Sequence, residues 1–281
     1  MKKFFVFLMI ALAMLLTFSS CEKDDSPQDT ATEQIAMENT GKDFTTAQEL
    51  MKSTDDEVEE QVALAMMPST PNSPPCPTRS LEFPQGTFPN TLTIDFGMEG
   101  CEGPHGHIRK GKIIVYMSAP MYEEGASRTL TFEDFSVDEV QIEGTKTLVN
   151  LGYNDEGFLS FSRTVEGALI SFPDETNISY DSEHTLVQIA GADTPANLHD
   201  NIFAITGSTS GINRMDMAFT ATVVDPLIKK RTCRWIVAGT SEIESDNGTA
   251  TLNYGNGNCN RIAQLTLPNG NTLVVHVRRW W

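Results

Sequence analysis

From residue 76 to the end of the chain, apolar and polar residues tend to alternate, and this period of two is typical of β-strands with one buried face. The segment "TLTIDFG", for example, places Leu92, Ile94 and Phe96 on one face. Turn-forming sequences such as "NDEG", "FPDE", "SDNG" and "LPNG" separate the strand-like segments. The pattern predicts an all-β domain over 76–281, either an antiparallel β-sandwich or a strongly curved sheet of many short strands.

One strand-like segment changes phase in its middle. In "RTLTFEDFSV" the alternation runs through Leu130 and Phe132 and resumes at Phe135 and Val137. A single extra residue in one strand of a pair produces such a shift, and so we expect a β-bulge here.

Residues 22–75 have a different composition, rich in Asp, Glu, Thr, Ser, Gln and Pro. The helical signal within them is a stretch that Ser53 could cap, with acidic residues in the first turn and a modest apolar face that includes Val58 and Val62. The prolines of "PSTPNSPPCP" end any helix. We therefore expect 21–75 to be an acidic, flexible tether with one short helix.

The first residues have the layout of a secretory signal peptide. Two lysines precede the apolar stretch 4–18, which is short for a membrane-spanning helix, and two serines precede Cys21. A cysteine placed directly after small residues resembles a bacterial lipobox, although Phe18 stands where Leu is usual. This predicts a signal peptide over 1–20 and a lipid, such as palmitate, on Cys21 that anchors the protein to a membrane. An ordinary signal peptide with an incidental cysteine is the alternative.

The segment after this cysteine bears on the location of the protein. Lys23, Asp24 and Asp25 resemble the short lysine-plus-acidic signal that sends many Bacteroidota lipoproteins to the outer face of the outer membrane. We therefore expect a surface-exposed, lipid-anchored protein of the cell outer membrane. A solvated acidic linker is the alternative, in which case the protein could face the periplasm.

The charge of the chain excludes one class of partner. The sequence holds 38 acidic and 20 basic residues, for a net charge of −18, and removal of the signal peptide would take away two more lysines. Such a chain repels nucleic acid, so we expect no nucleic-acid partner. The surplus carboxylates would permit weak Ca²⁺ contacts without indicating a site.

Two segments of the all-β region resemble each other. "TIDFGMEGC" (93–101) and "TLNYGNGNC" (251–259) share Thr, an apolar residue, Asp or Asn, an aromatic residue and Gly, and each ends in Cys. Downstream, 109–117 echoes 268–277. We therefore expect one structural module to be used twice, over about 76–118 and 233–278.

Four cysteines remain once Cys21 carries a lipid, namely Cys76, Cys101, Cys233 and Cys259. An even number outside a reducing cytosol predicts two disulfides, for which three connectivities are open. The repeat favours local pairing, Cys76 with Cys101 and Cys233 with Cys259. Each bond would close a loop of about 25 residues and stabilise the fold by roughly 3–4 kcal/mol.

These motifs together carry a family resemblance. The pattern "DFGMEGC … HIRKGKIIV", the central "ITGSTSG" and the closing "NYGNGNCN … LPNGNTLVV", preceded by a lipobox, resemble a group of uncharacterised Bacteroidota surface or secreted lipoproteins. The resemblance covers most of 76–281. The resemblance implies that the protein is a lipoprotein and that it is located at the cell surface or secreted. It supplies no catalytic residues.

The glycine-rich segments are expected to be turns. "GNGN" (255–258) lacks the third glycine of a dinucleotide-binding loop and any following helix pattern, and "GSTSG" (207–211) has Thr209 where a nucleophile elbow has serine. His105 and His107 could chelate a transition metal on one strand face, but no third ligand is evident. We therefore predict no metal site and no cofactor.

The acidic residues offer the alternative function. A glycosidase needs two carboxylates about 5–10 Å apart. Seven acidic residues are candidates: Asp95, Glu133, Asp134, Asp155, Glu156, Asp174 and Glu175. Solvated loop charge is the simpler interpretation, so we assign no catalytic residue.

The sequence favours a non-enzymatic binding or structural protein of the cell envelope, with a glycan or an envelope protein as partner; a secreted polysaccharide hydrolase is the alternative. Trp280 and Trp281 at the terminus are expected to pack on the domain.

Overall fold

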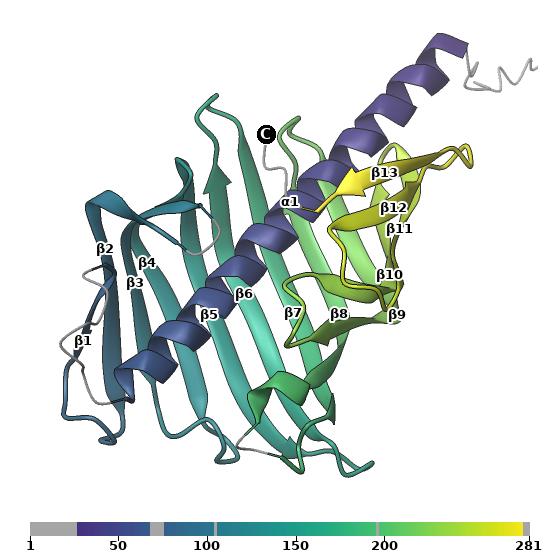
Figure 1. The fold of residues 1–281 in the computed structure, drawn as a ribbon. Helices are drawn as coiled ribbons and strands as arrows, with labels where there is room; N and C mark the ends of the chain where they lie inside the picture. Colours follow the sequence, from purple (N-terminus) through teal and green to yellow (C-terminus); the bar gives the residue numbers. More distant parts are fainter. Residues whose placement is uncertain (1–26, 68–75, 104–105, 195–196, 278–281) are drawn as a thin grey trace, which may run out of the picture.

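The computed structural model describes residues 27–67, 76–103, 106–194 and 197–277. Their strands form one antiparallel sheet in which each strand pairs with its neighbours in sequence, from β1 to β13. The sheet bends into a trough, and α1 crosses its concave side diagonally (Figure 1). The predicted all-β class is confirmed, in the form of a strongly curved sheet rather than a sandwich.

Several predictions fall outside the described residues: the signal peptide over 1–20, the acylation site Cys21, the potential metal ligand His105, and the packing of Trp280 and Trp281. In the part of the chain that the structure describes, no helix is both long and apolar enough to span a bilayer.

The helix α1 spans Pro27–Ala65, and the short 3-10 helix η1 spans Leu198–Asp200. The strands are β1 (Thr78–Leu81), β2 (Asn90–Glu102), β3 (Ile108–Met117), β4 (Ser127–Val137), β5 (Val140–Tyr153), β6 (Leu159–Ser171), β7 (Asn177–Ala190), β8 (Ile202–Ile212), β9 (Ala218–Lys230), β10 (Ile236–Ser245), β11 (Gly248–Asn256), β12 (Ile262–Thr266) and β13 (Thr272–His276). Most of these strands are longer than the sequence suggests. Irregular positions let a strand bend around the helix and continue instead of ending.

The bulge predicted in β4 is present. Lys112 of β3 pairs with Glu133, whereas Lys110 pairs with Ser136, so β4 has one residue more than β3 between these two pairs. Asp134 takes up the extra residue with a positive φ of 48°. The apolar residues on both sides of the bulge therefore face the concave side of the sheet.

The helix differs from the predicted tether. It extends over 39 residues, and Met37, Phe44, Met51 and Val58, which are spaced seven residues apart, are buried in the core. The ring of Phe44 meets that of Phe219 on β9 edge to face, with centroids 6.1 Å apart. The trough covers more than one side of α1, so polar residues between these positions are buried as well. This is why the periodic apolar signal is weak. Residues 27–65 belong to the domain.

The N-terminal half of α1 is also fixed by polar contacts. Asn213, in the loop between β8 and β9, donates a hydrogen bond from Nδ2 to Thr40 Oγ1 at 2.8 Å, and the Arg214 backbone N–H donates to Asp43 at 3.0 Å. Further along, the buried Tyr254 hydroxyl on β11 hydrogen-bonds to Gln48. The helix is therefore held along its length by side chains far away in sequence.

The two resembling segments have the same local structure. Asp95 accepts a hydrogen bond from the Gly97 backbone N–H at 2.8 Å, and Asn253 accepts one from Gly255 at the same distance. Both glycines have a positive φ, which explains why the motif requires glycine. Asn150 and Gly152 form the same turn at the end of β5, where no cysteine follows, so the turn also occurs outside the two segments.

The four cysteines pair locally, as predicted. Cys76 bonds to Cys101 and Cys233 bonds to Cys259, each with Cα atoms 5.7 Å apart. Each bond joins the start of one strand of a hairpin to the end of the other, in β1–β2 and in β10–β11. The predicted correspondence does not extend to a third strand. Residues 109–117 lie in β3, next to β2, whereas 268–277 include β13, which β12 separates from β11.

Candidate ligand cavity between the helix and the sheet

A cavity of about 960 Å³ lies between the second half of α1 and the concave face of the sheet. It reaches the loops at one end of the sheet, where Met121, Asn201 and Thr232 line it. Its volume is at the upper end of the range of small-molecule sites in proteins. The strands β4 to β9 supply most of its floor, in two neighbouring rows of inward-facing side chains.

The first row contains hydrogen-bond donors. In the strand register, Arg128 of β4 is opposite Leu148 of β5, Leu148 is opposite Arg163 of β6, and Arg163 is opposite His184 of β7. Neighbouring strands lie about 4.8 Å apart, and side chains converge on the concave face of a curved sheet. We refer to Arg128, Arg163 and His184 as the donor row.

The second row is apolar and runs parallel to the first. Phe161 of β6 is opposite Leu186 of β7, Leu186 is opposite Ile205 of β8, and Ile205 is opposite Leu227 of β9. All four line the cavity, and we refer to them as the apolar row. On β6 and β7, which carry residues of both rows, the rows lie two positions apart along the strand, so a ligand can touch both at once.

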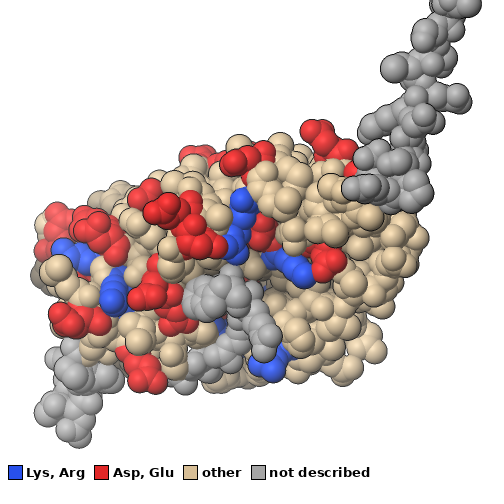
Figure 2. All heavy atoms as spheres, turned by 90° about the horizontal axis from the view of Figure 1, so that it is seen from above, with Lys and Arg blue, Asp and Glu red and all other residues tan. Residues whose placement is uncertain are grey.

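The charges around the cavity are divided between the sheet and the helix. Among the described residues, the charged ones that the sheet and its loops contribute are all basic: Arg109, Arg128, Lys146, Arg163, Lys229, Arg231 and Arg234. The helix contributes Lys52 and the acidic residues Asp55, Asp56, Glu57, Glu59 and Glu60. By contrast, Asp and Glu side chains outnumber Lys and Arg on the face seen in Figure 2. The trough is thus a basic region in a strongly acidic protein.

Asp55 is the central acidic residue of the cavity. It pairs with Lys146 and lies 3.3 Å from Arg163. Burial raises the pKa of Asp55, but the charges of Lys146 and Arg163 outweigh this effect and hold the pKa below its usual value. Burial lowers the pKa of Lys146 to about 8, against the opposing effect of Asp55. Both members of the pair are therefore charged at neutral pH.

Arg128 is held less tightly. It forms an ion pair with Glu59, with 3.9 Å between Arg128 Nη2 and the carboxylate, and Glu59 also pairs with Arg231. The charge of Asp55 also acts on Arg128. Only 8% of Arg128 is exposed, and its buried Nε–H has no hydrogen-bond acceptor among the described residues. A buried donor without an acceptor costs roughly 1–3 kcal/mol, so such groups usually have a ligand or a water molecule as partner.

His184 is the second polar group without a partner at this site. It is 6% exposed, and its Nδ1 forms no hydrogen bond within the described chain. Burial, together with the charge of Arg163, lowers its pKa to about 3. The imidazole is therefore neutral at physiological pH and offers one donor and one acceptor nitrogen.

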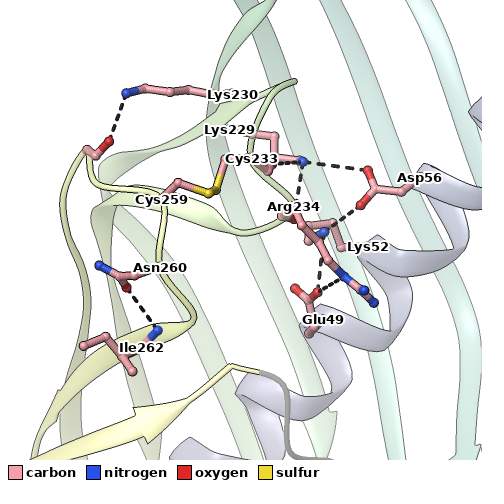
Figure 3. Close-up of a disulfide and its surroundings, with 11 residues drawn as sticks. Glu49, Lys52, Asp56, Lys229, Lys230, Cys233, Arg234, Cys259, Asn260 and Ile262 are labelled. Atoms are coloured by element: carbon pink, nitrogen blue, oxygen red, sulfur yellow. Dashed lines mark hydrogen bonds and ion pairs between the residues drawn. A yellow bond between two sulfur atoms is a disulfide. The ribbon is translucent and has the colours of Figure 1, made fainter. Parts of the chain in front are cut away.

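A second group of ion pairs joins α1 to the end of β9 and to the loop between β9 and β10 (Figure 3). Lys229 lies 3.8 Å from Asp56 and donates to the backbone carbonyl of Cys233 at 2.6 Å. Arg234 lies 3.8 Å from Glu49. Burial raises the pKa of Glu49 to about 7. The Cys233–Cys259 disulfide therefore fixes the loop that carries two of the basic residues of the cavity.

The acidic residues proposed from sequence as a glycosidase pair do not line this cavity. Several of them serve local structure instead. Asp95 accepts from a turn N–H, Glu133 lies 3.6 Å from Lys112, and Asp174 pairs with Arg214. The carboxylates at the cavity come from α1, which the sequence assigned to a tether.

The histidine motif also gives no metal site in the described chain. His107 Nδ1 hydrogen-bonds to Asp138, and His105 is not described. Among the described residues, no group of three or more His, Cys, Asp or Glu side chains is placed to hold a metal ion.

Sequence reasoning missed the donor row, although a signal for it exists. In "RTLTF" (128–132), "KTL" (146–148) and "RTV" (163–165), each basic residue is in phase with the apolar residues of its strand. An inward-facing charge in an alternating strand requires a buried partner or a ligand. This pattern marks β4, β5 and β6, three of the strands that form the floor of the cavity.

Comparisons of the chain with protein-family models, with curated proteins and with solved structures find no match. The function is therefore inferred from the residues of the cavity.

Proposed function

We propose that this protein is a non-enzymatic, lipid-anchored binding protein of the outer-membrane surface, and that it holds a small, largely apolar ligand between α1 and the sheet. The cavity of about 960 Å³ with its apolar row is the observation that carries the proposal. Small-molecule sites combine such an apolar surface with a few polar groups that fix the orientation of the ligand. The lipid on Cys21 and the surface location come from the sequence motifs.

The state of the carboxylates favours binding over hydrolysis. A glycosidase needs a carboxylic acid whose pKa is raised so that it can donate a proton. Asp55 instead has a lowered pKa and is held by Lys146 and Arg163. Glu49 has a raised pKa but is not among the residues that line the cavity. An apolar floor also suits an apolar molecule better than a glycan.

Binding of the uncharged fluorescent probe N-phenyl-1-naphthylamine tests this proposal. The protein would carry Cys21→Ser, which removes the acylation site and allows measurement without detergent. We expect saturable binding at one site. Leu148→Trp, which places a larger side chain in the cavity, should weaken binding at least tenfold.

A matched variant on the same strand provides the control. Leu151 is also on β5 but is 48% exposed and does not line the cavity, so Leu151→Trp should leave the affinity unchanged. The proposal is wrong if the parent protein shows no saturable binding, or if both tryptophan variants lose it equally.

A further inference from the structure

We propose that the ligand of this cavity is an anionic amphiphile, whose carboxylate or phosphate group is bound by the donor row and whose apolar chain lies along the apolar row. This inference rests on the proposed function and adds the chemical class of the ligand. It follows from the arrangement of Arg128, Arg163 and His184 beside Phe161 and Leu186.

The charge balance around the donor row favours an anion. A side niche of about 50 Å³ is bordered by three basic residues, Arg128, Lys146 and Arg163, and by two acidic ones, Asp55 and Glu59. Among the described residues of the niche, one positive charge is thus in excess, in a protein whose net charge is −18. Excess charge in a buried site is costly, and a monovalent anion would balance it.

The acidic residues at the niche already have partners. Asp55 pairs with Lys146, and Glu59 pairs with Arg231, which does not border the niche. Arg128 is left with one distant ion pair to Glu59 and a buried Nε–H without an acceptor. An arginine can bind a carboxylate or a phosphate through two parallel hydrogen bonds, which the loosely held Arg128 can provide.

His184, at the other end of the donor row, supports the same placement of the anionic group of the ligand. Its neutral ring can donate a hydrogen bond to an anion without adding a charge, and its Nδ1 has no partner among the described residues. Leu148 lies between Arg128 and Arg163 in the register, so the polar group would rest above an apolar side chain.

The apolar row explains why the ligand should also carry a chain. Phe161, Leu186, Ile205 and Leu227 form a continuous path over four strands, which starts two positions along β6 from Arg163 of the donor row. Each methylene group that is buried against such a surface adds to the affinity, so a chain of several carbons would supply most of it. The donor row would then set specificity for the charge.

Competition with the bound naphthylamine probe tests this inference. Four ligands with the same chain are compared below their micellar concentrations: dodecanoate, dodecyl phosphate, dodecanol and dodecyltrimethylammonium. We expect at least one of the two anions to displace the probe at a tenfold lower concentration than the alcohol, and the cation to be weakest. The preferred anion identifies the group as a carboxylate or a phosphate.

Two substitutions assign the effect to the donor row. Arg128→Gln should weaken the preferred anion at least tenfold and leave dodecanol and the probe unchanged. Lys112→Gln, which removes one positive charge from β3 outside the cavity, should change none of the four ligands.

The results also separate the two proposals. Probe binding with equal competition by the anions and dodecanol, or with an unchanged anion affinity in Arg128→Gln, would overturn the anionic class and leave the binding function standing. Absence of probe binding in the parent protein would overturn the binding function itself.

Discussion

Lys146 of β5 and Asp55 of α1 form an ion pair between the sheet and the second half of the helix. The same ammonium group donates hydrogen bonds to the backbone carbonyl of Met51 at 2.5 Å and to Thr54 Oγ1 at 2.9 Å. The side chain of Lys146 is only 2% exposed. All three of its donor positions are thus occupied by one turn of α1, so this lysine sets where the helix lies in the trough.

Replacement of Lys146 by methionine should destabilise the protein by about 3–5 kcal/mol. The substitution keeps the apolar stem but leaves Asp55 with Arg163 as its remaining close partner, and an inadequately paired buried charge is costly. Chemical denaturation, followed by circular dichroism, measures the free energy of unfolding.

A double variant distinguishes lost pairing from poor packing. Lys146→Met with Asp55→Asn removes both charges and should recover part of the loss. If the double variant is less stable than Lys146→Met alone, the loss in Lys146→Met comes from poor packing and not from an unpaired charge on Asp55.

The packing of α1 gives a second prediction. Phe44→Ala should lower the free energy of unfolding by about 3–5 kcal/mol, because the ring is fully buried and contacts Phe219. Ile35, on the same helix, is 58% exposed, so Ile35→Ala should change stability by less than about 0.5 kcal/mol. Equal, small effects of both substitutions would show that the helix is a detachable tether.

The contrast between the buried Phe44 and the exposed Ile35 bears on how much of the fold the sequence could predict. In the strands, a period of two marks inward positions clearly, because each strand has one buried face. This is how Leu92, Ile94, Phe96 and the β4 bulge could be placed. The helix is surrounded by the trough, so polar residues such as Thr40 and Thr54 are buried beside Phe44. Its apolar and polar positions then differ little in burial, and its role in the core could not be read from the sequence.

The cavity shows a different limit. The inward phase of Arg128 and Arg163 is visible in the sequence, but their acidic partners lie on a helix far away in the chain. Pairing across such distances depends on where the trough places α1. The cysteines were easier to assign, because the same residue types flank Cys101 and Cys259 and the disulfides close short loops.

The disulfides give a third prediction. Replacing either cysteine pair by serine should lower stability by about 3 kcal/mol, since each bond closes a loop of similar length. Loss of Cys233–Cys259 should also expose the loop between β9 and β10 to protease, because the disulfide ties this loop to the segment that follows β11.

Peptide mapping without reduction provides the control for this prediction. It should yield peptides that join Cys76 to Cys101 and Cys233 to Cys259. A peptide that links Cys76 to Cys259 would contradict both the pairing and the loop assignment.

The predicted lipid anchor can be tested directly. The parent protein should incorporate labelled palmitate and sediment with membranes, and Cys21→Ser should abolish both properties. Protease treatment of intact cells then reports the side of the membrane, since a surface-exposed protein is cleaved without lysis. Palmitate incorporation that persists in Cys21→Ser would exclude this residue as the acylation site.

The raised pKa of Glu49 predicts how stability depends on pH. Burial raises this pKa from 4.5 to about 7, against the opposing charges of Lys52 and Arg234. The folded state therefore binds the proton more tightly than the unfolded state. Its stabilising contribution is complete below pH 4.5 and is lost as the pH rises to about 7. The loss amounts to roughly 3 kcal/mol, since one pKa unit corresponds to about 1.4 kcal/mol.

Glu49→Gln removes this titration. The stability of the variant relative to the parent should rise by roughly 3 kcal/mol between pH 4.5 and pH 8, and most of the rise should occur below pH 7. Urea denaturation at several pH values measures the difference, and Glu60→Gln, at an exposed position of the same helix, is the matched control. A difference that stays constant with pH, or that falls as the pH rises, would show that Glu49 is ionised in the folded protein throughout this range.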